Sequence, residues 1–207
     1  MKYTTQVGTD HYHGKSYRQQ DRWNSYFHQL FLVRQCNPAS VLEIGVGEGT
    51  VARELRNAGV EVITLDIDPD LKPDVVGSIT EMPVVDKSVD VVLAAEVLEH
   101  IEFTDVPQAL RELKRAARTH VVVGLPHPGW VFSVAYKLPL LPRIELIGKI
   151  PFFWKEHAFN GQHYWELGKK GYPVARFVDA AREAGLTLVS NHVYQDDPAH
   201  RFFIFSV

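Results

Sequence analysis

The sequence predicts a doubly wound α/β fold of three layers, with helices on both faces of a mostly parallel sheet. Short, nearly continuous apolar runs alternate with amphipathic helical patterns, which is typical of a parallel sheet that is buried on both faces. The first run ends in a glycine-rich turn that leads into a helix. A short polar turn joins the last two runs, so we expect them to form an antiparallel hairpin at the C-terminus.

Each predicted element rests on its local pattern. Strands are expected where β-branched and other apolar residues run together and stop at glycine or acidic residues. Helices are expected where apolar residues recur every three or four positions. The expected strands cover 41–44, 60–65, 89–94, 121–125, 186–194 and 201–207. The expected helices cover 21–35, 50–58, 107–118 and a segment from Pro173, as the first helical residue, to Gly185.

Two segments lie outside this alternation, although 207 residues favour a single domain. Residues 1–38 form an N-terminal helical cap, in which an aromatic stripe on the helix at 21–35 is expected to pack in the core. Residues 126–172 are too long for an ordinary connection and are interpreted as a lid insertion. The aromatic stripe consists of Trp23, Tyr26, Phe27 and Phe31.

Composition excludes several classes of protein. The chain has 45% hydrophobic and 23% charged residues and a net charge of −3, which indicates a globular protein without the general positive charge of a nucleic-acid binder. The only cysteine, Cys36, cannot form an internal disulfide. Because the N-terminus has no apolar signal segment and charged residues interrupt Trp130 to Trp154, we expect a cytoplasmic protein without a transmembrane segment.

No metal site is expected from the sequence. A lone cysteine cannot build a thiolate site. His11 and His13 are two residues apart and have no cysteine or carboxylate at a matching spacing. The sequence therefore gives no specific sign of a bound metal.

The strongest chemical signal is the turn VLEIGVGEGT at 41–50, which contains Gly45, Gly47 and Gly49. Glycines allow positive φ angles and let a ligand approach the backbone closely. The turn also presents main-chain N–H groups at the start of a helix. Asp66 ends the second strand, where an acid can accept hydrogen bonds from both hydroxyls of a ribose. Together these features predict a ligand that contains adenosine.

A nicotinamide dinucleotide is the rival ligand. Its fingerprint is G-x-G-x-x-G/A, but the sixth position counted from Gly45 is Thr50, and the third glycine comes one residue early. Glu43, two residues before Gly45, would repel a pyrophosphate, whereas a carboxylate there can lie near an ammonium or a sulfonium group. The dinucleotide interpretation is weaker on both counts.

The motif Glu43-x-Gly45-x-Gly47-x-Gly49 resembles the first motif of class I S-adenosylmethionine-dependent methyltransferases. LDIDPDL at 65–71 resembles the second motif, and 77–101 resembles the stretch that ends in Leu-Glu-His. The resemblance covers about 40–125 in order and spacing. It implies a Rossmann-like sheet of seven strands and S-adenosylmethionine as the cofactor.

The resemblance also implies which residues bind that cofactor. Asp66 would bind the ribose, Ile67 would pack on the adenine, and Glu96 would lie beside the methionine end. Ser78 stands where the family commonly has Asp, and Val89 replaces a common Phe. Tyr26 and Gln29 on the N-terminal helix are further polar contacts that the resemblance suggests. The predicted cofactor-binding residues are Glu43, Gly45, Gly47, Gly49, Asp66, Ile67, Ser78, Ile79 and Glu96.

Two histidines are candidates for a general base. His127 directly follows the strand at 121–125, and His163 lies three residues before Glu166, on a shared face if that stretch is helical. Either imidazole could take a proton from an acceptor hydroxyl, or could instead orient the loop backbone. The Glu99-His100 pair looks catalytic by itself, but in the resembled family it mostly closes a turn, so a structural role is expected for His100.

The resulting prediction is a methyltransferase that acts on a small molecule, either partly hydrophobic or glycan-related. Residues 130–154 are apolar, aromatic and stiffened by proline; they would line a substrate pocket, make peripheral contact with a membrane, or pack against themselves. A non-catalytic protein that binds an adenosyl ligand and, less favoured, an NAD(P)-dependent oxidoreductase are the alternatives. The sequence does not decide the oligomeric state.

Overall fold

A computed structural model describes residues 2–6, 8, 19–137, 139–140 and 144–207. The main sheet has seven strands in the order β3-β2-β1-β4-β5-β9-β8. Neighbours from β3 to β5 pair in parallel, and β9 pairs antiparallel with both β5 and β8. This topology confirms the predicted fold class. The strands are β1 (Ser40–Ile44), β2 (Glu61–Asp66), β3 (Val75–Val76), β4 (Val89–Ala95), β5 (Ala117–Pro126), β8 (Thr187–His192) and β9 (His200–Ser206).

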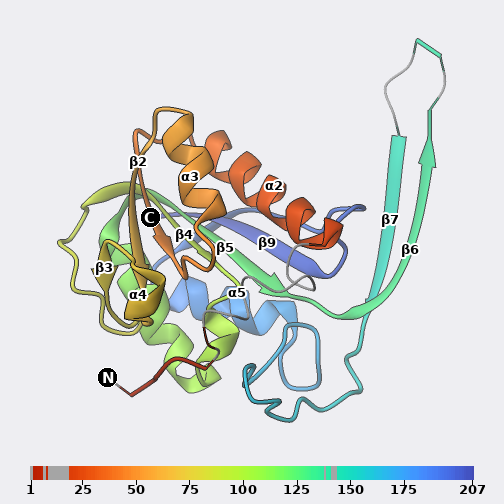
Figure 1. Cartoon of the computed structure of the whole chain (residues 1–207). Helices are drawn as coiled ribbons and strands as arrows, with labels where there is room; N and C mark the ends of the chain where they lie inside the picture. Colours follow the sequence, from red (N-terminus) through yellow and green to blue (C-terminus); the bar gives the residue numbers. More distant parts are fainter. Residues whose placement is uncertain (1, 7, 9–18, 138, 141–143) are drawn as a thin grey trace.

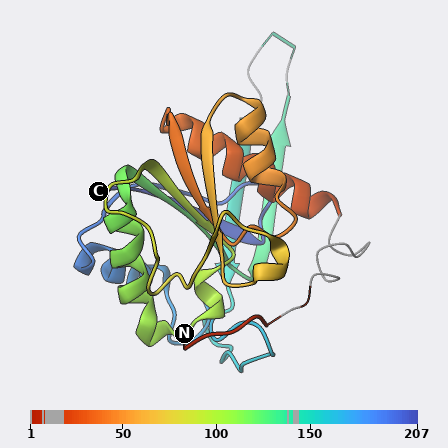
Figure 2. The same cartoon turned by 60° about the vertical axis from the view of Figure 1, so that its left-hand side comes forward.

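Helices cover both faces of this sheet, as Figures 1 and 2 show. On one face α2 (Gln20–Gln35) packs against α3 (Thr50–Asn57). On the other face α4 (Val106–Ala116) packs against α5 (Val174–Glu183). The two helical layers explain why the strands are apolar on both sides.

Strand β4 shows how the core is divided between the two faces. Val91 and Leu93 belong to the hydrophobic cluster under α2 and α3. Val92 and Ala94 belong to the cluster under α4 and α5. All four side chains are at most 1% exposed, so neighbouring residues on one strand anchor opposite layers.

Two predicted boundaries were wrong. The helix expected over 107–118 ends at Ala116, and Ala117 already pairs with Val89 in the sheet. The gain from strand pairing outweighs the good helix propensity of alanine there. Pro173 is not the first helical residue but the N-cap of α5, with an extended ψ of 155°.

Of the aromatic stripe of α2, only Tyr26 packs in the core as expected. Trp23, Phe27 and Phe31 are 51%, 59% and 43% exposed. The buried face combines apolar residues such as Leu32 with polar ones, among them His28, which stacks on Tyr194 with 3.6 Å between the ring centroids. One ring nitrogen of His28 is paired, with 2.8 Å between Nε2 and Asp196 Oδ1, which reduces the cost of burying this polar side chain.

The segment expected to be a lid contains a two-stranded hairpin, β6 (Gly129–Tyr136) and β7 (Ile144–Pro151). The hairpin projects away from the main sheet in both views (Figures 1 and 2). Its two strands pair only with each other among the described strands. Residues 152–172 follow as turns without a helix, so His163 and Glu166 do not share a helical face.

None of the helices in the described part of the chain combines the length and the hydrophobicity needed to cross a membrane.

Candidate active site

The glycine turn after β1 has the backbone geometry that its sequence predicts. Gly45, Gly47 and Gly49 have φ angles of 79°, 53° and 72°, in the region that other residues rarely adopt. A Cβ on Gly45 would lie 2.6 Å from Cγ2 of Val97, so no larger residue fits there. Gly49 is the N-cap of α3, and its neighbours present their N–H groups at the start of that helix.

Asp66 lies at the end of β2 and is tied to this turn. Its Oδ2 accepts a hydrogen bond of 2.8 Å from the backbone N–H of Val46, and its Oδ1 accepts one of 2.9 Å from that of Asp68. Burial raises the pKa of Asp66, although these hydrogen bonds oppose the shift. The two backbone donors fix the carboxyl group and leave acceptor capacity on each oxygen for a ligand.

A cavity of about 740 Å³, partly open to solvent, extends from Asp66 along the carboxyl edge of the sheet. Ile67, Ser78 and Ile79 line one part of it, and residues 3–6 of the N-terminal segment line another. Gly45 and Glu96 belong to this cavity and also to a smaller, more polar one of about 490 Å³. The two cavities therefore meet at the glycine turn.

Glu43 is buried at the smaller cavity, and its Oε2 has no hydrogen-bond partner among the described residues. Burial raises the pKa of Glu43 to about 8, against the opposing effects of the Ala52 backbone and the Arg56 charge. A buried carboxyl with an unpaired oxygen is costly unless a ligand satisfies it. This position can therefore receive a cationic group.

Glu96 follows β4 with a φ of 56°, a strained backbone conformation for a residue with a side chain. Its Oε2 lies 3.4 Å from Nε2 of His200, and Nδ1 of His200 lies 2.6 Å from Oδ1 of Asp197. Burial would lower the pKa of His200, but the two carboxylates raise it to about 10. Burial would likewise raise the pKa of Glu96, but the His200 charge holds it below its ordinary value. A fixed ion pair therefore lies where the two cavities meet.

The structure brings most of the predicted cofactor residues together. All except Gly49 line one or both cavities. Tyr26 and Gln29 of α2 line the smaller cavity. The hydroxyl of Ser78 contacts that of Thr80 at 2.9 Å.

His127 lies apart from these cavities. It is 1% exposed and lines neither of them. Burial, together with the charges of Lys149 and Arg201, lowers the pKa of His127 to about 3. An imidazole with such a low pKa is a weak base. His127 lies against Gly168 and accepts a hydrogen bond from Arg201, so we infer that it supports the segment at 152–172.

His163 lies next to the cavities without lining them. Its Nδ1 is 3.2 Å from Oε1 of Glu166, and Lys169 bonds the other Glu166 oxygen at 2.7 Å. Burial would raise the pKa of Glu166, but His163 and Lys169 lower it to about 2. The His163 ring lies 5.0 Å from the ring of His100, which lines the large cavity.

Sequence reasoning missed three parts of this site. His100 was expected to be structural, yet it lines the large cavity. The N-terminal segment at 3–6 also lines this cavity, but it contains no sequence motif that would have indicated this. Gln6 anchors the segment, with its Oε1 2.7 Å from Nδ1 of His100. His200 was taken as part of a polar turn. Since β9 is antiparallel, its first residue lies at the carboxyl edge of the parallel strands, and this rule could have placed His200 at the site.

His11 and His13 lie outside the described residues.

Comparison with known proteins agrees with this geometry. Residues 42–123 match the family model of a methyltransferase domain. No curated protein matches the chain. The domain match and the fold confirm the resemblance to class I S-adenosylmethionine-dependent methyltransferases that the glycine turn and Asp66 first indicated.

Several solved structures share the fold at low sequence identity. A TehB-like S-adenosylmethionine-dependent methyltransferase from Corynebacterium glutamicum has a TM-score of 0.60 at 16% identity, covering 96% of this chain and 98% of that one. The 1,6-didemethyltoxoflavin-N1-methyltransferase of Burkholderia thailandensis, solved with bound 1,6-didemethyltoxoflavin and S-adenosylhomocysteine, has a TM-score of 0.54 at 13% identity, covering 81% of this chain and 70% of that one. The glycopeptide N-methyltransferase MtfA, solved with S-adenosylhomocysteine, has a TM-score of 0.59 at 12% identity, covering 87% and 88%.

Proposed function

We propose that this protein transfers the methyl group of S-adenosylmethionine to a small-molecule acceptor. The observation that carries the proposal is the pair of cavities joined at Gly45 and Glu96, with Asp66 in one and Glu43 in the other. The neighbours solved with S-adenosylhomocysteine support the same cofactor. His127 is buried away from the cavities, so the proposal assigns it no part in the reaction.

The donors and acceptors present fit this cofactor. Asp66 has acceptor capacity for the ribose hydroxyls, and the unpaired oxygen of Glu43 suits the ammonium group. Ile67 and Ile79 offer apolar surface for the adenine. A dinucleotide fits less well, because its pyrophosphate would lie beside the buried Glu43.

The protein's contribution is to position the reactants and exclude water. The bound cofactor supplies a methyl group already activated by a positively charged sulfur. Holding an acceptor in line with it can lower the barrier by about 7–11 kcal/mol. Glu96 is held rigidly by His200 where the cavities meet, so it is placed to orient polar groups of the reactants. His163 remains our candidate for accepting a proton from an acceptor hydroxyl.

The direct test is formation of S-adenosylhomocysteine with a panel of small acceptors that includes phenols, amines and glycan precursors. We expect turnover with at least one class and no NAD(P) binding by calorimetry. Cofactor binding without turnover across the panel would favour the non-catalytic alternative, and binding of NAD(P) instead would support an oxidoreductase.

A pH dependence of cofactor binding should follow from Glu43. Its carboxyl is neutral below pH 8 in the free protein, and binding an ammonium group requires it to lose the proton. The affinity for S-adenosylhomocysteine should therefore rise by up to about tenfold per unit between pH 6 and 8 and then level off. In Glu43→Gln this rise should disappear. Calorimetric titrations across this range provide the measurement, and equal slopes in both proteins would contradict the role of Glu43.

We also propose that the hairpin β6–β7 meets an anionic lipid surface, which would give access to a partly apolar acceptor. Register places Trp130, Phe132, Val134 and Tyr136 of β6 on one face with Ile144, Leu146 and Ile150 of β7, and all of them are exposed. An isolated apolar hairpin is poorly stable in water. Residues 129–155 carry four basic side chains and one acidic side chain, whereas the whole chain has a net charge of −3. This local positive charge favours an anionic membrane over a second copy of the chain.

Flotation with liposomes tests this surface. The protein should float with vesicles that contain anionic lipid, and the double variant F132S/L146S should lose at least about tenfold in partitioning, because each side chain contributes about 1.5–3 kcal/mol on burial. Val85→Ser is the matched control, since Val85 is 77% exposed outside the hairpin. Failure to float, or dimerisation through the hairpin in sedimentation, would rule out the lipid surface.

A further inference from the structure

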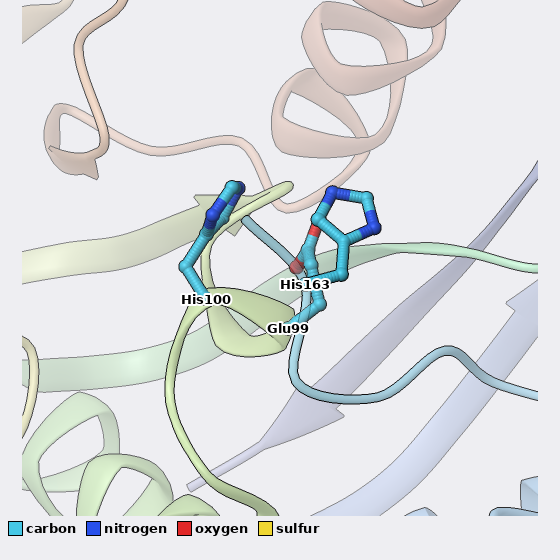
Figure 3. A group of neighbouring side chains, drawn as sticks. All are labelled: Glu99, His100 and His163. Carbon is cyan, nitrogen blue, oxygen red and sulfur yellow. The ribbon is translucent and has the colours of Figure 1, made fainter. Parts of the chain in front are cut away.

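Beside the cofactor cavity lies a group of side chains that the cofactor does not require. Glu99 and His100 belong to the 3₁₀ turn η2 (Leu98–His100), and His163 comes from the segment after the hairpin. One potential ligand atom from each lies within 4.8 Å of the others. Figure 3 shows the carboxylate of Glu99 between the two imidazole rings.

The carboxylate of Glu99 lacks any compensating group in the described structure. It is fully buried, and neither oxygen has a hydrogen-bond partner. The two neighbouring acids are different: Glu96 pairs with His200, and Glu166 pairs with Lys169. Leaving one buried carboxylate unpaired between two imidazoles is costly, and a bound cation would remove that cost.

The two imidazoles are oriented as metal ligands usually are. Nδ1 of His163 is held by the Glu166 carboxylate at 3.2 Å, and Nδ1 of His100 lies 2.7 Å from Oε1 of Gln6. Carboxylates and amides in such second-layer positions fix ring orientation and raise the basicity of the ligand. Two ligand atoms of one ion lie at most about 4.4 Å apart, twice a typical metal–ligand bond, so the ion would draw together the three ligand atoms, which already lie within 4.8 Å of one another.

We propose that Glu99, His100 and His163 form a binding site for a divalent first-row transition metal ion. Two imidazoles and one carboxylate favour such an ion over Mg²⁺ or Ca²⁺, which prefer oxygen ligands. Three protein ligands leave coordination positions for water or for an oxygen of the acceptor. The entry path is the large cavity, which His100 lines.

This inference rests on the proposed function only in one respect, the acceptor oxygen as a further ligand. The position of the cluster beside Glu96 places the ion next to the point where the two cavities meet. When an ion is bound, His163 is a metal ligand; without an ion, it keeps the role of candidate general base. The metal site itself can be tested without any methyl transfer.

The test is titration of chelator-treated full-length protein with Zn²⁺ by calorimetry and with Co²⁺ by visible absorption. We expect one ion per chain and the d–d bands of a protein-bound Co²⁺. Glu99→Gln and His163→Gln should each weaken binding by at least about tenfold. The matched controls Glu102→Gln and His192→Ala change the same residue types outside the cluster and should bind as the unsubstituted protein does.

Two outcomes would overturn the metal site: less than one ion per chain, or affinity that is unchanged in both Glu99→Gln and His163→Gln with circular dichroism showing intact folds. If Glu99 is protonated and binds no metal, the titration will show less than one ion per chain. If Glu99→Gln does not fold, His163→Gln alone decides. Titration of S-adenosylhomocysteine into the unsubstituted protein is measured separately, so that loss of the cofactor and loss of the metal are distinguishable.

Discussion

Asp66→Ala should weaken binding of S-adenosylhomocysteine by at least about 100-fold. The ribose would lose two hydrogen bonds to a charged acceptor, each contributing about 1.5–3 kcal/mol. The backbone N–H groups of Val46 and Asp68 would also lose their acceptor, which loosens the glycine turn. Calorimetric titration measures the loss directly.

Two further variants make this result specific. Asp66→Asn keeps an acceptor oxygen without the charge, so its affinity for S-adenosylhomocysteine should fall between those of the unsubstituted protein and Asp66→Ala. Asp70→Ala removes an exposed carboxylate from the turn that follows Asp66 and should leave the affinity for S-adenosylhomocysteine unchanged. Binding by Asp66→Ala within threefold of the unsubstituted protein would mean that Asp66 does not hold the ligand.

Trp165→Ala should lower the free energy of unfolding by about 3–5 kcal/mol, the usual range for removing a large buried aromatic side chain. Trp165 is fully buried and packs edge-on against Phe103 at 4.9 Å between ring centroids. Its indole Nε1 donates to the carbonyl oxygens of Leu98 and Ile101 at 3.1 and 3.2 Å. Urea denaturation gives the change in free energy.

Because Leu98 begins η2 and Ile101 directly follows it, Trp165 also fixes the turn that carries Glu99 and His100. Trp165→Phe keeps most of the packing but loses the indole N–H, so it should cost less than Trp165→Ala. Trp23→Ala is the control, because Trp23 is 51% exposed and should change stability little. A cost below 1 kcal/mol for Trp165→Ala would contradict the anchoring role.

The fold was largely predictable because local pattern and tertiary role agree in the central strands. The run at 89–94 is apolar except for Asp90 and becomes β4, which is buried on both faces. The hairpin β6–β7 was not predicted, because β6 is apolar or small at every position, so no alternation distinguishes it from a loop. Nor was β3, since a strand of two residues leaves no periodicity to detect.

The cofactor half of the site was predictable for a related reason. Gly45 is needed for the positive φ angle at the end of β1, and Asp66 supplies a carboxylate at the end of β2. Each role depends on a single strand end, so the spacing of the two residues in the sequence is enough to indicate them. The remaining part of the site depends on contacts between distant segments. His200 reaches Glu96 from 104 positions further along the chain, and His163 meets His100 across 63 positions. No local pattern contains such pairs.

The pairing of β9 with β5 has a consequence for synthesis of the protein. The cation that neutralises Glu96 is His200 of β9, which follows the glycine turn, Asp66 and Glu96 itself in the sequence. On the ribosome, a nascent chain therefore carries its entire glycine turn and Asp66 long before Glu96 can find its counterion. A premature stop codon shortly before His200 would leave every recognisable motif in place and still yield an incomplete site.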